Sequence, residues 1–210
     1  MTFGSVVIAA GLSGLLSFAF LAVAIGTEYW YIIEVNPVHN STGKYQSSHS
    51  GLWIIYEERN GSYHDISIDL NMTEASEQYK HLSNLHKVIV ILLPVSLVAL
   101  VFGGIFGLVA SLARSYALLT GEAVYFFICS FFTLSGMCIY VSYSEHAMDL
   151  LQREMGTELP AHVHVSYGWS LAMACLSYCL ELATSFLLML AARLAYRKRH
   201  HESTVTLSMT

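Results

Sequence analysis

Four long apolar segments alternate with polar segments along the chain. Each apolar segment has about 23 to 27 residues, which is enough for an α-helix to cross a hydrocarbon core of about 30 Å. The apolar segments are residues 3–25, 88–112, 117–143 and 167–190. The polar segments are a first loop at residues 27–87, a second loop at 144–166 and a tail at 191–210. The pattern predicts an all-α four-helix bundle in a membrane, forming one domain over residues 1–210.

The first loop has the pattern of a small antiparallel β-sheet. Residues 29–33 and 51–56 are rich in aromatic and β-branched side chains, which favour strands. Asn60-Gly61 is typical of a two-residue hairpin turn. In residues 66–70, Ile and Leu alternate with polar side chains, as expected of a strand with one apolar face. These features predict three or more strands that cover the ends of the helices.

The other polar segments are predicted to extend the helices and the sheet. Residues 73–87 begin with a helix-start signal and are predicted to continue into the second span. Residues 144–155 are predicted to prolong the third span, and Pro160 ends any such helix. Residues 162–166 are predicted to add a strand to the sheet.

Charge and glycosylation signals indicate the orientation. The densest basic cluster follows the fourth apolar segment and consists of Arg193, Arg197, Lys198 and Arg199. Because cytosolic segments are enriched in Lys and Arg, the tail is predicted to be cytosolic, and four crossings place the N-terminus there too. The three glycosylation sequons begin at Asn40, Asn60 and Asn71, all in the first loop. We therefore expect a plasma-membrane glycoprotein with cytosolic termini and an extracellular sheet.

Composition narrows the possible function classes. The 210 residues are 55% hydrophobic and 12% charged, which excludes an ordinary soluble domain. The net charge of −5 comes mostly from acidic residues in the two loops, so nucleic acid is not expected as a partner. The cysteines are Cys129, Cys138, Cys175 and Cys179, all within the third and fourth spans. No disulfide is expected in the extracellular loops, although such loops often use one for rigidity.

Two acidic residues lie within the apolar segments. Glu181 is about 20 Å from the outer end of the fourth span, and Glu122 lies several residues into the third. An acidic group at such depth is costly and suggests a function, so the pair could handle protons or ions or bind a partner helix. The alternative is that a protonated Glu181 forms hydrogen bonds between spans while Glu122 reaches the interface. No Lys, Arg or His within the apolar segments provides a counter-charge.

Three other patterns bear on packing and chemistry. Gly103 and Gly107 form a GxxxG pattern, which allows close helix packing within the bundle or against another protein. His162 and His164 would share one strand face, but no Cys or carboxylate set completes a zinc site, so no metal is expected. We find no nucleophile–base pair and no phosphate loop in the sequence, so we expect no cofactor and no enzymatic activity.

Several short blocks, in this order on four spans, resemble one superfamily of membrane proteins. The blocks are Trp30 with Gly51-Leu52-Trp53, and Tyr167-Gly168-Trp169-Ser170 at the entry to the fourth span. They resemble the claudins, the peripheral myelin protein 22 relatives and the γ-subunits of calcium channels and glutamate receptors, with the second block closer to the γ-subunits. Residues 26–33, 47–53 and 92–97 are most similar to transmembrane proteins 114 and 235. The resemblance covers about residues 4–200 and implies a claudin-like fold.

The chain departs from the family pattern at one place. The resemblance implies a disulfide within the sheet, with its first cysteine shortly after the Gly-Leu-Trp motif and its second several residues later. Here Tyr56 occupies the first position, and the second falls near residues 62–65, which contain no cysteine. Loss of a native disulfide typically costs about 2–5 kcal/mol in a small extracellular domain. We expect the packing of Trp30 and Trp53 to hold the sheet instead, or the sheet to be looser than in relatives.

The resemblance implies a non-enzymatic protein that acts in the bilayer by binding other integral membrane proteins. An accessory subunit would modulate a channel or receptor through its outer loop and its third and fourth spans. A junction or adhesion protein would instead bind copies of itself and join cells. A small oligomeric transporter or channel that uses Glu181 is a further alternative. The block at residues 167–170 favours the accessory subunit.

Overall fold

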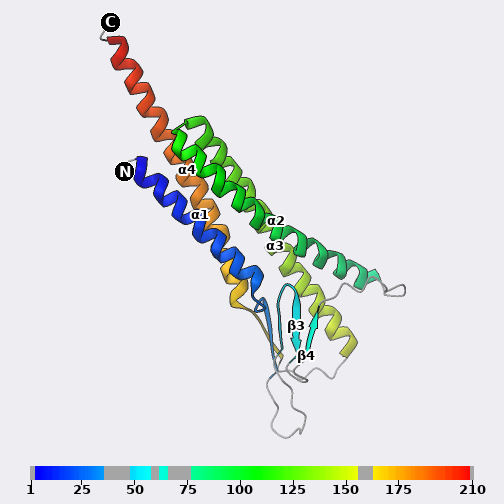
Figure 1. Ribbon diagram of the computed structural model, residues 1–210. Helices are drawn as coiled ribbons and strands as arrows, with labels where there is room; N and C mark the ends of the chain where they lie inside the picture. The colour runs from blue at the N-terminus through cyan, green and yellow to red at the C-terminus, as the bar shows by residue number, and fades with distance from the viewer. Residues whose placement is uncertain (1–2, 36–47, 58–61, 66–76, 156–162, 209–210) are drawn as a thin grey trace. The chain divides into compact units, whose positions relative to one another are not determined.

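The described part of the chain, residues 3–35, 48–57, 62–65, 77–155 and 163–208 of a computed structural model, contains four long helices. They are α1 (Phe3–Gly26), α2 (Glu77–Ala113), α3 (Tyr116–Met155) and α4 (Trp169–Ser208), as drawn in Figure 1. Each contains a stretch long and apolar enough to span a membrane. Helices form along these stretches because hydrocarbon offers no water to the backbone N–H and C=O groups. The prediction of four membrane helices is confirmed.

The helices extend beyond the apolar segments that predicted them. α2 begins at Glu77, and α3 continues to Met155, as expected from the helical patterns in the two loops. α4 ends at Ser208, well beyond the end of its apolar segment at residue 190. Because the 40 residues of α4 correspond to about 60 Å at about 1.5 Å per residue, this helix exceeds the thickness of a hydrocarbon core.

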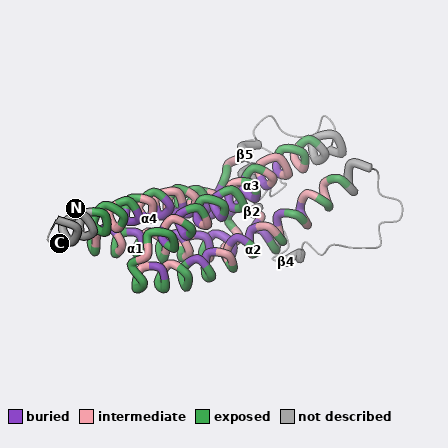
Figure 2. Tube along the Cα trace, turned by 90° about the horizontal axis from the view of Figure 1, so that it is seen from above, coloured by how far each residue is buried: buried purple, intermediate pink, exposed green. Residues whose placement is uncertain are grey.

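The chain forms two compact units, and each helix has residues in both. The first unit is Met1–Leu21, Val95–Leu134 and Leu176–Thr210, and the second is Ala22–Pro94 and Ser135–Cys175. The core of the first unit takes one or more apolar side chains from every helix. Its buried members include Val6, Ala10, Leu100, Leu119, Ala123, Phe126 and Leu188. Figure 2 shows buried residues recurring along the helices between exposed ones, as expected of helices with one packed face.

The second unit contains a five-stranded antiparallel sheet. Its strands are β1 (Tyr31–Val35), β2 (Ser48–Ser50), β3 (Ile54–Glu57), β4 (Ser62–Asp65) and β5 (Val163–Tyr167). The strand order is β4-β3-β2-β1-β5, so β5 from the second loop pairs with β1 from the first. The predictions of an antiparallel sheet and of a strand from the second loop are both confirmed.

One predicted strand of the first loop begins later than the sequence pattern indicated. The sequence pattern predicted a continuous strand over residues 51–56, whereas β2 ends at Ser50 and β3 begins at Ile54. The break coincides with Gly51, where an added Cβ would lie 2.6 Å from the Cα of Glu28. Only glycine tolerates so close an approach of two backbones, and the chain reverses direction there.

The predicted hairpin is present as the antiparallel pair β3–β4, with residues 58–61 between the paired Glu57 and Ser62. Several other predictions of the sequence fall outside the described residues and are therefore not tested. They concern the turn at Asn60-Gly61, the strand at residues 66–70, Pro160, His162 and the sequons at Asn40 and Asn71.

Candidate functional site

The two signature tryptophans lie at the C-terminal end of α1. A helix leaves its last carbonyl groups without partners inside the helix. The indole Nε1 of Trp30 donates to the Ala24 carbonyl at 2.7 Å, and that of Trp53 donates to the Ile25 carbonyl at 3.0 Å. Trp30 is fully buried and packs on Tyr140 of α3, whereas Trp53 is 43% exposed. The signature tryptophans therefore cap the first span and attach the sheet to it.

The second signature block joins the sheet to α4 at a position that requires glycine. A Cβ at Gly168 would overlap the carbonyl oxygen of Tyr29 and lie 2.5 Å from its carbonyl carbon. The Gly168 N–H donates to the Trp30 carbonyl at 3.0 Å, and the Ser170 N–H donates to the Tyr29 carbonyl at 3.2 Å. The hydroxyls of Ser170 and Thr27 are 2.8 Å apart. This block thus holds the start of α4 against the segment that leaves α1.

Aromatic side chains are exposed around this joint. Tyr29 stacks on His49 with ring centroids 4.6 Å apart and on Trp169 with centroids 5.9 Å apart. The exposed members are Tyr29, Trp53, Tyr167 and Trp169. Tyr31 packs edge-on against Tyr167, and burial, followed by the proximity of Tyr167, raises the pKa of Tyr31. Exposed Tyr and Trp at the ends of spans are typical of a membrane–water interface.

Glu181 lies within a buried polar cluster in the first unit. The Thr133 Oγ1 is 2.9 Å and 3.1 Å from its two carboxyl oxygens, and the Ser177 Oγ is 3.3 Å from Oε1. The Thr133 Oγ1 is also 2.6 Å from the Ser96 Oγ. Glu181, Thr133, Ser177 and Ser96 each have an exposed fraction of 0%. The carboxyl of α4 is therefore connected to hydroxyls on α3 and α2 without contact with the surface.

The same cluster reaches α1 through a reciprocal pair of serines. The Ser17 hydroxyl donates to the Ser177 carbonyl at 3.1 Å, and the Ser177 hydroxyl donates to the Ser17 carbonyl at 2.8 Å. One turn earlier in α1, the Ser13 hydroxyl is 2.6 Å from the Thr184 hydroxyl. All four helices of the first unit thus contribute to one set of hydrogen bonds.

Glu122 does not belong to this cluster. It is 6% exposed, its Oε1 has no hydrogen-bond partner among the described residues, and its Cγ lies 3.8 Å from where a Cβ of Gly107 would be. Thr133, which contacts Glu181, is about 16 Å further along α3 at about 1.5 Å per residue. The structure therefore does not bring the two acidic side chains together. Gly103 also faces α3, since a Cβ there would lie 3.0 Å from the Tyr125 ring.

The sequence pattern did not identify the hydroxyl partners of Glu181. Ser177 could have been found, because a residue four positions earlier lies on the same helix face. Thr133 and Ser96 could not, because a single sequence does not show which faces of separate helices meet.

In the described residues, His81 and His146 stack with ring centroids 6.1 Å apart. Across the described part of the chain, no group of three or more His, Cys, Asp or Glu is arranged to hold a metal ion. His164 of β5 pairs in register with Glu34 of β1. None of the described cysteines forms a disulfide; Cys129 is buried and the others are exposed.

Comparisons with known proteins relate most of the chain to one family. A family model described as "PMP-22/EMP/MP20/Claudin tight junction" matches residues 15–190. The voltage-dependent calcium channel gamma-5 subunits of Mus musculus and Rattus norvegicus are each 30% identical to the chain over 172 residues, which cover 76% of this chain and 60% of each relative. The chain thus spans about 60% of the length of the curated relatives that it matches.

Proposed function

The chain belongs to the PMP-22/EMP/MP20/claudin family of membrane proteins, and from this membership we propose that it is an accessory subunit that binds and modulates a channel or receptor. Its similarity to proteins named as voltage-dependent calcium channel gamma-5 subunits supports a pore-forming subunit of that class as the partner. The proposed mode of action is binding within the membrane, without an enzymatic reaction or a cofactor.

The observation that carries this proposal is an exposed aromatic stripe on α3. The stripe consists of Val124, Phe127, Ile128, Phe131 and Phe132, which are 42% to 53% exposed. Their helical spacing places them on one face of α3. The rings of Phe127 and Phe131 meet edge to face with centroids 5.1 Å apart, which gives this face a defined shape. Helices in a bilayer associate by such van der Waals packing, so we place the partner helix against this stripe.

The test is co-purification of the protein with the pore-forming subunit of a voltage-dependent calcium channel, together with recording of the channel current. The double variant Phe127→Leu with Phe131→Leu keeps an apolar surface for lipid but removes the packed rings. We expect it to lose co-purification and the effect on current. The matched control is Phe102→Leu with Phe106→Leu on α2, where the phenylalanines are 51% and 55% exposed. Equal binding by both double variants would contradict the proposed interface.

Glu181 has a structural role in this proposal. A charged carboxylate in a membrane interior needs several donors or a cation. The Thr133 hydroxyl divides its one proton between Glu181 and the Cys129 carbonyl, and the Ser177 hydroxyl divides its proton between Glu181 and the Ser17 carbonyl. A protonated carboxyl can instead donate to the Thr133 oxygen and leave the Thr133 proton for another acceptor. Because Glu181 is fully buried, this arrangement favours an interhelical bond over a transport site.

Replacement of Glu181 by Gln separates the structural role from transport. Gln keeps the size of the side chain and can donate to Thr133, so we expect normal surface expression and normal binding of the partner. Loss of a measurable ion or substrate flux with unchanged surface expression would instead support the transporter alternative.

A junction or adhesion role is the second candidate, because the family model is described by the tight junction and the sheet presents β4 and β5 as edges. Exposed edges can pair with strands of another molecule. The readout is the distribution of tagged protein in mixed cultures. Enrichment only where two expressing cells touch would favour adhesion over the accessory role.

We also propose that the protein lies in the plasma membrane with both termini in the cytosol. The first loop would then be extracellular and carry glycans at Asn40, Asn60 and Asn71. Enzymatic deglycosylation of protein from intact cells should increase its electrophoretic mobility. Replacement of each asparagine by Gln in turn should remove one step of that shift. A tag at the C-terminus should be inaccessible to antibody until the cells are permeabilised.

A further inference from the structure

A cavity of about 460 Å³ lies in the first unit at the end where α1 begins and where α2 turns into α3. It is lined by the first residue of α1, by the turn between α2 and α3 and by α4. The lining residues are Phe3, Ala113, Arg114, Ser115, Tyr116, Leu194, Ala195, Lys198 and Arg199. Cavities of about 300–1,000 Å³ are the usual size of small-molecule sites in proteins.

The cavity has a cationic side and an apolar side. Cationic groups come from the α2–α3 turn, as Arg114, and from α4, as Lys198 and Arg199. An apolar wall comes from Phe3 and Leu194, together with two alanines. One side of the cavity can thus bind a multiply charged anion, and the other can bind hydrocarbon. A ligand that matches both sides is amphiphilic and carries several negative charges.

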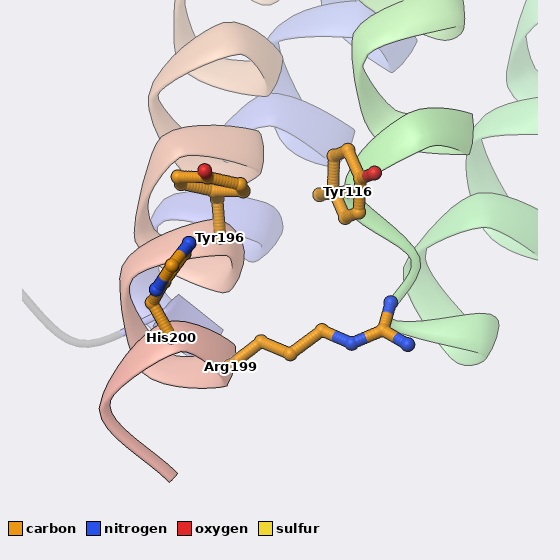
Figure 3. A pocket seen from close by; sticks show the side chains of 4 residues that line it. All are labelled: Tyr116, Tyr196, Arg199 and His200. Atoms are coloured by element: carbon orange, nitrogen blue, oxygen red, sulfur yellow. The ribbon is translucent and has the colours of Figure 1, made fainter. Parts of the chain in front are cut away.

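A second cavity of about 300 Å³ continues the first and shares Tyr116 and Arg199 with it. The rings of Tyr116 and Tyr196 meet edge to face with centroids 5.6 Å apart. Figure 3 shows the Arg199 side chain extended from α4 toward the turn that precedes Tyr116. Guanidinium groups bind phosphate through two parallel hydrogen bonds, and tyrosine hydroxyls can donate one more.

The position of the cavity suits a lipid headgroup. The apolar stretches of α2 and α3 end at Ala113 and begin at Tyr116, and α1 begins at Phe3, so the cavity lies where the hydrocarbon core would end. The turn between α2 and α3 is tight, since Arg114 has a φ of 47°. Arg114 lines the cavity together with residues of α4. Basic pockets between spans on the cytosolic side are suited to anionic headgroups.

We propose that this cavity binds a polyanionic phospholipid of the inner leaflet, a phosphoinositide carrying phosphate monoesters, with its headgroup on Arg114, Lys198 and Arg199. Three cations match such a headgroup better than the single net charge of phosphatidylserine. The apolar wall at Phe3 and Leu194 would contact the glycerol and the first methylene groups. The site is separate from the proposed partner surface on α3, and it uses the proposed cytosolic orientation.

The experiment uses the full chain in phosphatidylcholine nanodiscs and a fluorescent phosphatidylinositol bisphosphate as the probe. The test variant is Lys198→Gln with Arg199→Gln. The control is Arg193→Gln with Arg197→Gln, which removes the same charge from exposed positions of the same helix that lie on another face and do not line the cavity. Each cation at an anionic surface contributes roughly fivefold to binding. We expect the test variant to bind roughly 25-fold more weakly, and the control to change by less than about threefold.

Further binding measurements show whether the ligand is a lipid or a soluble headgroup and which lipid is bound. Phosphatidylserine nanodiscs of matched total charge should compete poorly, and soluble inositol bisphosphate should bind at least about tenfold more weakly than the lipid, because it lacks the apolar part. Equal losses in the two double variants would overturn the site in favour of diffuse attraction to the tail. Equal affinity for the soluble headgroup, or for phosphatidylserine, would overturn a phosphoinositide lipid as the ligand.

Discussion

Replacement of Gly168 by Ala should break the joint between the sheet and α4. The added Cβ would lie 2.5 Å from the carbonyl carbon of Tyr29. Because carbon atoms in contact are about 3.5–4.0 Å apart, the two backbones must separate by about 1 Å or more. The hydrogen bonds from Gly168 to Trp30 at 3.0 Å and from Ser170 to Tyr29 at 3.2 Å would then exceed bonding distance.

The cost can be worked from these two bonds. Each backbone hydrogen bond contributes about 0.5–1.5 kcal/mol, and a buried group left without a partner costs about 1–3 kcal/mol. Two such groups give an expected loss of about 2–6 kcal/mol in the free energy of unfolding, which places the substitution among the severe ones. Gly168 is itself buried, so water cannot readily replace the lost partners.

Thermal unfolding of the purified protein in nanodiscs measures this loss, and hydrogen exchange at the amides of residues 168 and 170 locates it. Gly104→Ala is the control, since a Cβ there meets nothing within 4 Å. A helical Gly104 gains or loses little when it becomes alanine, within about 1 kcal/mol. If Gly168→Ala were as stable as Gly104→Ala, or if the amide of residue 170 stayed protected, the close approach at this joint would be refuted.

Two further predictions concern the polar cluster and the sheet. Thr133→Val should lower the free energy of unfolding by about 1–3 kcal/mol, because it leaves Glu181 without its nearest partner. Thr120→Val, whose hydroxyl bonds within its own helix, should cost clearly less in the same thermal assay, and an equal loss would contradict the cluster. Tyr56 pairs with Tyr63 across β3 and β4, so the double variant Tyr56→Cys with Tyr63→Cys should form a disulfide and gain about 2 kcal/mol when oxidised. Retention of two free thiols by mass spectrometry after oxidation would contradict this register.

The helices could be predicted because membrane insertion depends on local sequence. An apolar run of sufficient length must form a helix in hydrocarbon, whatever its neighbours are. The same criterion could not predict the end of α4 at Ser208, because the residues after 190 mix apolar and charged side chains and form no long apolar run. Helix formation there follows from backbone propensity and continuity with the span.

In the sheet and the polar cluster, contacts between distant segments of the chain could not be predicted from the sequence. The strand content of the first loop was visible, but the break at Gly51 depends on Glu28, which approaches it only in the folded chain. Likewise, the depth of Glu181 in its span indicated a special role, whereas its contact with Thr133 depends on which helix faces meet. The tryptophans were expected to support the sheet. That Trp30 donates to the Ala24 carbonyl required the chain reversal after α1 to be known.

The disulfide that the resemblance implies, and that this chain lacks, would stabilise one part of the sheet more than the rest. The attachments to the helices lie next to three of the five strands: Trp30 precedes β1, Trp53 precedes β3 and Gly168 follows β5. β4 lies at the opposite edge and, in the described residues, pairs only with β3. Tyr56 on β3, where the resemblance implies the first cysteine, pairs with Tyr63 on β4.

Cross-strand side-chain pairs in sheets generally contribute about 0.2–1 kcal/mol, whereas a disulfide there would contribute about 2–5 kcal/mol. The loss of stabilisation is therefore concentrated in the β3–β4 hairpin, while the joint between the sheet and the helices keeps its own hydrogen bonds. Local opening is expected to cost least where such attachments are few. A partner that contacts this hairpin would bind the part of the sheet that lacks the disulfide, whereas the aromatic stripe of α3 lies on a continuous helix. This difference is a physical reason to place the main binding surface on α3 and a secondary, adaptable contact on the hairpin.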